Sequence, residues 1–107
     1  MKAYSATEPD VFAVSGDELR IHWDATKLTM KDMDDVEQTT WVANEALVKV
    51  HDSREKIIEK IIGSVYSIQE EIALINNRDE RPEDYGVYQT VRQTAKDLAT
   101  QWVNQRD

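Results

Sequence analysis

The side chains best suited to acid–base or metal chemistry are the two histidines, His22 and His51. Both lie at or near the ends of predicted strands, and Asp24 and Asp52 follow them closely in the chain. A histidine beside a carboxylate can serve as an acid–base pair or as part of a divalent-cation site. No further ligand stands at a fixed helical or strand spacing from either histidine, so we expect structural roles for both.

An acidic cluster in the segment 25–37 is the other candidate for a cation site. Its members are Asp32, Asp34, Asp35 and Glu37. The sixth residue of an EF-hand calcium loop is glycine, whereas the sixth residue counted from Asp32 is Glu37. The segment has no sustained period and carries many like charges, so we interpret it as a mobile, solvated acidic loop without a metal ligand.

Groups for covalent catalysis and for cofactor binding are also missing from the sequence. There is no cysteine, which excludes thiolate nucleophiles, disulfides and the common zinc frameworks. No serine stands in a Gly-x-Ser-x-Gly motif, and no glycine-rich phosphate loop is present. We therefore expect no catalytic, metal-binding or cofactor-binding residue and no cofactor. A small hydrolase-like enzyme that uses His22 or His51 is kept as a third alternative.

The composition is that of a small acidic protein without a membrane segment. Its 107 residues, 40% of them hydrophobic, suit one globular domain covering residues 1–107. The formal net charge is -8, and residues 1–52 hold 11 acids against 5 bases. Such a charge repels phosphate backbones and anionic lipids, so we expect no nucleic acid and no membrane, but a protein partner or self-association. The polar first residues and the absent cysteines favour a cytoplasmic location.

Residues 10–51 show the pattern of a three-stranded antiparallel meander. Val11–Val14 and the alternating segment Glu18–Asp24 flank a turn signal at Gly16, which predicts a hairpin. Gln38–Val50 has strand character again and predicts the third strand. Three strands of this kind need a covering layer to be stable in water.

The third predicted strand contains an irregularity beside a tryptophan. Its apolar residues change parity at Asn44–Glu45, which predicts a bulge at that point. Trp23 and Trp102 continue apolar periodicities and are predicted to be core residues, whereas Trp41 lies where the phase breaks. We therefore predict that a partner surface includes Trp41 and the acidic loop. Its candidate residues are Trp41, Asp32, Asp34, Asp35 and Glu37.

Residues 52–104 are predicted to be helical and to cover one face of the meander, which makes the fold class α+β. The predicted helices are Ser53–Ser64, Ile68–Asn76 and Pro82 to about Val103, and one continuous helix over residues 53–76 is the alternative to the first two. Asp52 with Glu55 and Ser67 with Glu70 have the spacing of capping boxes. The short connection before Pro82 predicts that the long helical segments are antiparallel neighbours.

An isoleucine-rich face runs through the first two predicted helices. Its members recur at spacings of three and four: Ile57, Ile58, Ile61, Ile62, Val65, Ile68, Ile72 and Ile75. We interpret this face as core that joins the sheet to the last helix. Should it prove exposed in the monomer, it would become the leading candidate for the partner surface.

The order of several short segments resembles a family of small uncharacterised proteins from phage and prophage tail regions. These segments are Thr7-Glu8-Pro9-Asp10, Trp41 with Asn44-Glu45, Ser64-Val65-Tyr66-Ser67, Ile75-Asn76-Asn77, and Pro82-Glu83-Asp84-Tyr85 before Tyr88-Gln89. The resemblance covers most of the chain, and the acidic loop departs from it. It implies a role in the virion or in its assembly and carries no catalytic residue with it.

Two functions of different classes follow from these observations. The first is a structural or protein-interaction module, in line with the resemblance to tail-region proteins and the supply of aromatic side chains. The alternative is an acidic inhibitor or nucleic-acid mimic, which the charge of residues 1–52 favours.

Overall fold

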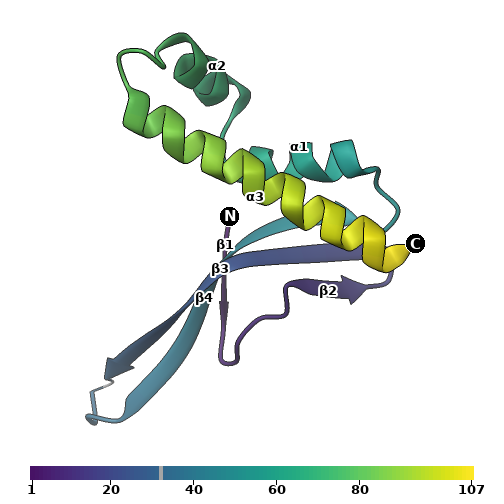
Figure 1. Cartoon of the computed structure of the whole chain (residues 1–107). Helices are drawn as coiled ribbons and strands as arrows, with labels where there is room; N and C mark the ends of the chain where they lie inside the picture. The colour runs from purple at the N-terminus through teal and green to yellow at the C-terminus, as the bar shows by residue number, and fades with distance from the viewer. Residues whose placement is uncertain (32) are drawn as a thin grey trace. The chain divides into compact units, whose positions relative to one another are not determined.

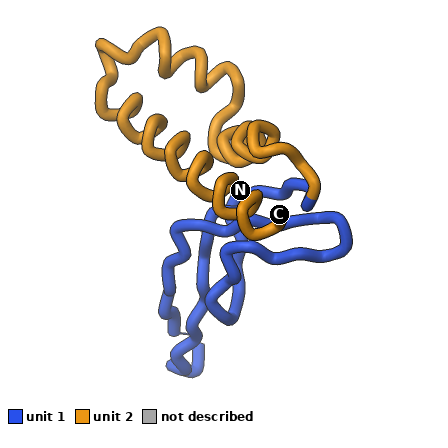
Figure 2. Tube along the Cα trace, turned by 45° about the vertical axis from the view of Figure 1, so that its right-hand side comes forward, with its two compact units in different colours: residues 1–50 blue, residues 51–107 orange. Residues whose placement is uncertain are grey.

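The computed structural model describes residues 1–31 and 33–107, which form two compact units. Unit 1 is Met1–Val50 and unit 2 is His51–Asp107 (Figure 2). All described strands lie in unit 1 and all described helices in unit 2, so the α+β class is confirmed. The prediction of a single domain stays a prediction.

Unit 1 is a four-stranded antiparallel sheet in the order β1-β4-β3-β2 (Figure 1). Its strands are β1 (Lys2–Ser5), β2 (Phe12–Ser15), β3 (Glu18–Lys31) and β4 (Glu37–Lys49). The predicted count of three strands is wrong by one, because β1 was missed. Its four residues show no run of alternating apolar side chains, and its place in the sheet comes from backbone pairing with residues 41–44 of β4.

The prediction of a mobile acidic loop at residues 25–37 is wrong for most of that segment. β3 continues to Lys31 and β4 begins at Glu37, and the two pair in register from Thr26 opposite Val42 to Lys31 opposite Glu37. The hairpin thus extends past β1 and β2 as a two-stranded ribbon (Figure 1). The threonines at 26, 29, 39 and 40 suit such a ribbon.

The bulge predicted at Asn44–Glu45 is also wrong, because the extra residue lies on the opposite strand. Trp23 pairs with Asn44, but the next pair in the ladder is Thr26 with Val42, so β3 has one residue more than β4 at this point. Asp24 has a φ of 53°, in the left-handed region that aspartate tolerates better than most residues. The break therefore belongs to β3, although the parity change in the sequence of β4 suggested otherwise.

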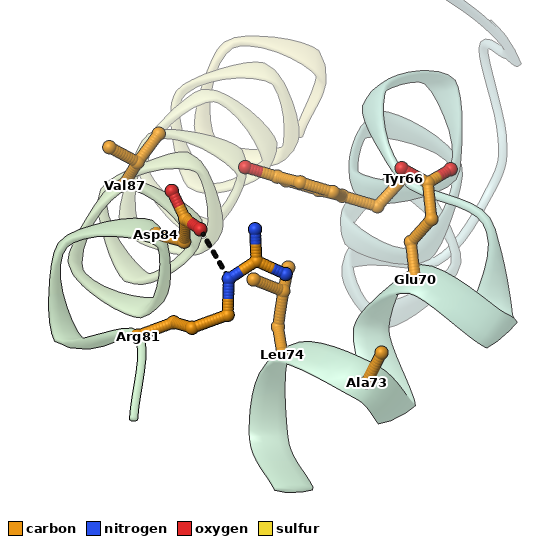
Figure 3. Close-up of a pocket in the computed structure, with 7 residues that line it drawn as sticks. All are labelled: Tyr66, Glu70, Ala73, Leu74, Arg81, Asp84 and Val87. Atoms are coloured by element: carbon orange, nitrogen blue, oxygen red, sulfur yellow. Dashed lines mark ion pairs between the residues drawn. The ribbon is translucent and has the colours of Figure 1, made fainter. Parts of the chain in front are cut away.

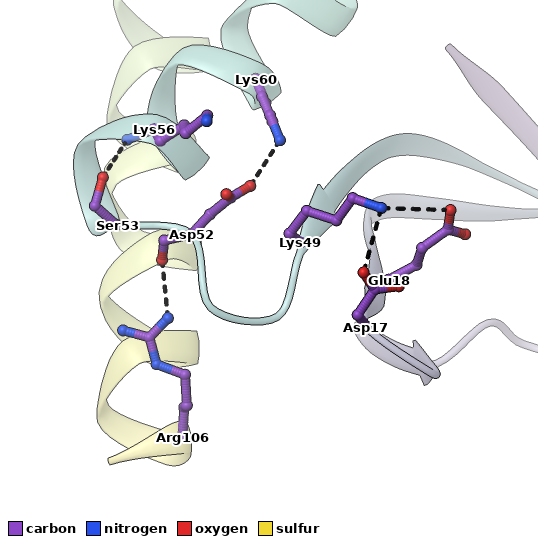
Figure 4. Close-up of polar contacts among 8 residues, drawn as sticks. All are labelled: Asp17, Glu18, Lys49, Asp52, Ser53, Lys56, Lys60 and Arg106. Atoms are coloured by element: carbon purple, nitrogen blue, oxygen red, sulfur yellow. Dashed lines mark hydrogen bonds and ion pairs between the residues drawn. The ribbon is translucent and has the colours of Figure 1, made fainter.

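The predicted first hairpin is confirmed. Gly16 adopts a φ of 64° between β2 and β3, the conformation that a tight turn requires of glycine. Near this turn the Lys49 ammonium lies 3.6 Å from Asp17 and 3.8 Å from Glu18 (Figure 4). Trp23 is buried as predicted, and five other apolar side chains of the described sheet are also buried. They are Leu19, Ile21, Ala43, Ala46 and Val48.

Unit 2 consists of α1 (Arg54–Val65), α2 (Ile68–Asn76) and α3 (Pro82–Arg106), close to the predicted bounds. α1 lies along the C-terminal half of α3, and α2 lies by its N-terminal half (Figure 1). The Arg54 side chain donates to the Thr100 hydroxyl at 2.9 Å. The predicted core residue Trp102 is buried with seven other side chains of this unit: Ile57, Ile61, Ile62, Tyr88, Ala95, Leu98 and Ala99.

Of the two predicted helix caps, one is confirmed and one is wrong. Ser67 and Glu70 form the expected capping box of α2. For α1 the cap is Ser53, whose hydroxyl accepts from the Lys56 amide, and not Asp52. Asp52 has other partners: its carboxylate is 2.7 Å from the Lys60 ammonium, and its carbonyl accepts from the Arg106 guanidinium at 2.8 Å (Figure 4).

Candidate protein-interaction surfaces

His22 contacts two other segments of unit 1, and its structural role stays a prediction. Its side chain is almost fully buried, with Nδ1 2.8 Å from the Asp10 carbonyl oxygen and Nε2 2.8 Å from a Glu45 carboxylate oxygen. Each ring nitrogen therefore lies within hydrogen-bonding distance of an oxygen. The ring thus ties the segment before β2 to β4. His51 is exposed, and within the described residues no three His, Asp or Glu side chains are grouped to hold a metal ion.

The predicted partner surface is only partly brought together. Asp34, Asp35 and Glu37 are exposed at the end of the hairpin, and Asp32 lies outside the described residues. Trp41 is half-buried farther back on β4, where it pairs with Lys27 on one side and with Ser5 on the other. It is the most exposed of the three tryptophans, but its role in binding stays a prediction.

The hairpin from residue 26 to residue 40, which we call the arm, has no buried side chain among its described residues. Leu28 and Met30 share one face of the arm by the period of two. Both are exposed, as are Met33 and Val36 at the end. The arm is therefore an apolar as well as an acidic surface, which its charges did not indicate.

The isoleucine-rich face divides between the first two helices. Its α1 part is mostly hidden, with Ile57, Ile61 and Ile62 buried. In α2, by contrast, Ile68, Ile72 and Ile75 are 75%, 53% and 42% exposed, and no residue of the helix is buried. We call these three residues the isoleucine stripe. The interpretation of the whole face as core is therefore wrong for α2, where the stripe meets the condition set for a partner surface.

A hollow of about 500 Å³ adjoins the stripe where α1 turns into α2. Residues of both helices and of the turn between them form its lining: Glu59, Ile62, Gly63, Tyr66, Ile68 and Glu71. We call it the α1–α2 hollow. Ile68 belongs to the hollow and to the stripe, so the two form one continuous surface. The sequence offered no sign of the hollow, because it depends on the angle between two helices.

A second hollow, of about 310 Å³, lies between α2 and the start of α3 (Figure 3). Tyr66 and Leu74 project toward it from one side, and the Arg81 guanidinium pairs with Asp84 at 3.0 Å on the other. Its remaining lining residues are Glu70, Ala73 and Val87. Because acids and a base are both present, this hollow has no single charge preference.

Tyr88 connects α3 to α2 and to the turn before it. Its hydroxyl donates to Glu71 at 3.0 Å, and its ring meets Tyr66 edge-to-face at 5.2 Å. Burial, and then the bond to Glu71, raise the pKa of the Tyr88 phenol above its ordinary value of 10.0. Burial, and then the nearby Glu70 carboxylate, raise the pKa of Tyr66 in the same direction. These contacts position α2 without hiding its isoleucines.

Comparison with known proteins gives no further guide to the role of these surfaces. No protein-family model matches the chain, and neither the curated proteins nor the solved structures contain a significant match. The resemblance to phage tail-region proteins accordingly remains a prediction. In the part of the chain that the structure describes, no helix has the length and apolar character needed to cross a membrane.

Proposed function

We propose that this protein is a non-enzymatic interaction module that binds another protein through α2, as a phage or prophage tail or tail-assembly component would. The observation that carries the proposal is the isoleucine stripe. A capping box fixes the start of α2, yet this helix offers three large aliphatic side chains to solvent. Contiguous apolar exposure of this kind is typical of binding sites.

Size-exclusion chromatography with light scattering tests the proposal, on the protein alone and mixed with the products of neighbouring genes. We expect a complex with one of them or self-association. The double variant Ile68→Ser/Ile72→Ser should lose it, because the apolar contact drives association. The control is Val14→Ser in β2 of unit 1, where the aliphatic side chain is 56% exposed, close to the 53% of Ile72. A strict monomer that binds none of the products would overturn the proposal.

The arm supports a second candidate function, an acidic inhibitor or nucleic-acid mimic. Asp34, Asp35 and Glu37 stand exposed at its end, where they can approach a basic site on a target. Neutralising the four acids of the cluster as Asn or Gln should weaken inhibition of such a target steeply. If inhibition were unchanged, this candidate would fail.

A further inference from the structure

The isoleucine stripe and the α1–α2 hollow together form one surface on which a helix can lie, and we call it the docking surface. The stripe residues follow one another at steps of four and three along one side of α2. At a rise of 1.5 Å per residue they extend over about 10 Å, or two helical turns. An amphipathic helix presents its own apolar residues at the same spacing, so these residues can pack along the isoleucine stripe and into the hollow.

The charged residues around the docking surface favour a partner with positive charge. Glu59 and Glu71 are the charged residues that line the α1–α2 hollow. Residues 66–88, which hold α2 and the start of α3, contain six acids and two bases, a formal charge of -4. One of the two bases, Arg81, is paired with Asp84. Two carboxylates thus line the hollow, and the segment that carries the stripe has a net negative charge.

Three kinds of occupant are disfavoured by that charge. A nucleic acid or an anionic lipid surface would bring phosphates against carboxylates. A second copy docked stripe to stripe would place two negatively charged segments against each other, and like charges facing across an interface are unfavourable. A basic partner with an apolar face matches both the negative charge and the apolar side chains of the docking surface.

We propose that α2 and the α1–α2 hollow bind a basic amphipathic helix of a partner protein. The partner's aliphatic side chains pack on Ile68 and Ile72, and its Lys or Arg side chains reach Glu59 and Glu71. Glu71 can accept such a bond while it holds the Tyr88 hydroxyl, because a carboxylate has two oxygens. This inference rests on the proposed function and specifies the class of partner.

Fluorescence anisotropy with a labelled synthetic peptide tests the proposal. The probe is an amphipathic peptide of about 18 residues, made of leucine and lysine at helical spacing. We expect saturable binding that weakens as salt is raised, because exposed charge pairs are screened. A peptide of the same composition in scrambled order should not bind, and neither should one with glutamate in place of lysine.

Matched variants locate the binding site. Ile68→Ser/Ile72→Ser and Glu59→Gln/Glu71→Gln should each weaken peptide binding by about tenfold or more. The control Glu8→Gln/Glu37→Gln removes the same charge from exposed sites in unit 1 and should change binding less than about twofold. Circular dichroism of each variant verifies that the helices are intact.

The outcomes separate this inference from the proposed function. Equal binding of the scrambled peptide, or unchanged binding by the isoleucine variant, overturns the inference. If the isoleucine variant loses a native partner but the wild-type protein does not bind the Leu/Lys peptide, the proposed function holds and the basic helix is the wrong partner class. If the variant loses the peptide but keeps every native partner, the proposed function fails as located on α2.

Discussion

The burial of His22 makes Glu45 the polar residue of unit 1 whose loss we expect to cost most. Glu45→Ala would leave His22 Nε2 without its carboxylate partner in a site with little access to water. An unsatisfied buried donor costs about 1 to 3 kcal/mol, so the free energy of unfolding should fall by that amount. Urea denaturation measures the change.

Two further variants show whether that loss comes from the contact itself. Glu45→Gln keeps an oxygen acceptor and should lose less stability than Glu45→Ala. Glu37→Ala removes an exposed carboxylate from the same strand, and its effect should stay within about 0.5 kcal/mol. Equal losses for Glu45→Ala and Glu37→Ala would contradict the role given to the His22 contact.

Tyr88 should make the stability of the protein sensitive to alkaline pH. Its pKa in the folded state is raised by burial and by the bond to Glu71, so the fold favours the neutral phenol. The resulting stabilisation is complete below the ordinary pKa of 10.0 and is lost as the pH rises through the raised value. Melting temperatures across this range should fall more steeply for the wild-type protein than for Tyr88→Phe. Parallel pH profiles would contradict the expectation.

Among the elements, α1 and α2 should respond differently to loss of their caps. Removing a serine cap costs a helix about 0.5 to 2 kcal/mol. α1 contributes Ile57, Ile61 and Ile62 to the buried residues, so Ser53→Ala should lower the global free energy of unfolding. α2 buries no residue, so Ser67→Ala should mainly increase local opening, seen as faster amide exchange in residues 68–76. A global loss as large for Ser67→Ala as for Ser53→Ala would contradict this difference.

The arm is expected to be dispensable for the stability of unit 1. A two-stranded ribbon is marginally stable by itself, and no described side chain of this one is buried. Replacing residues 28–40 by Asn-Gly joins the pair Lys27 and Trp41 with a two-residue turn. Unfolding free energy should change by less than about 1 kcal/mol in urea denaturation. Ile21→Ala in the same sheet is the contrasting variant and should cost about 2 to 5 kcal/mol.

The elements that the sequence predicted well are those specified by local signals. The helices follow from apolar spacing, from Ser67 with Glu70, and from Pro82 at the first turn of α3. β1 and the arm were missed because strand pairing joins distant residues and needs no apolar alternation on an exposed ribbon. The same limit applies to the site: periodicity showed that the isoleucines share a face, but burial decides which of them are free to bind.

At the scale of the whole molecule, the remaining question is whether its two units unfold together. Each holds about half of 107 residues, a size at which an isolated domain buries too little surface to be more than marginally stable. We therefore expect one cooperative transition. In Trp102→Phe the remaining tryptophans, Trp23 and Trp41, both report on unit 1 by fluorescence, while far-ultraviolet circular dichroism reports mainly on the helices of unit 2. The two urea curves should coincide, as two-state unfolding requires, and separate midpoints would show two independent domains.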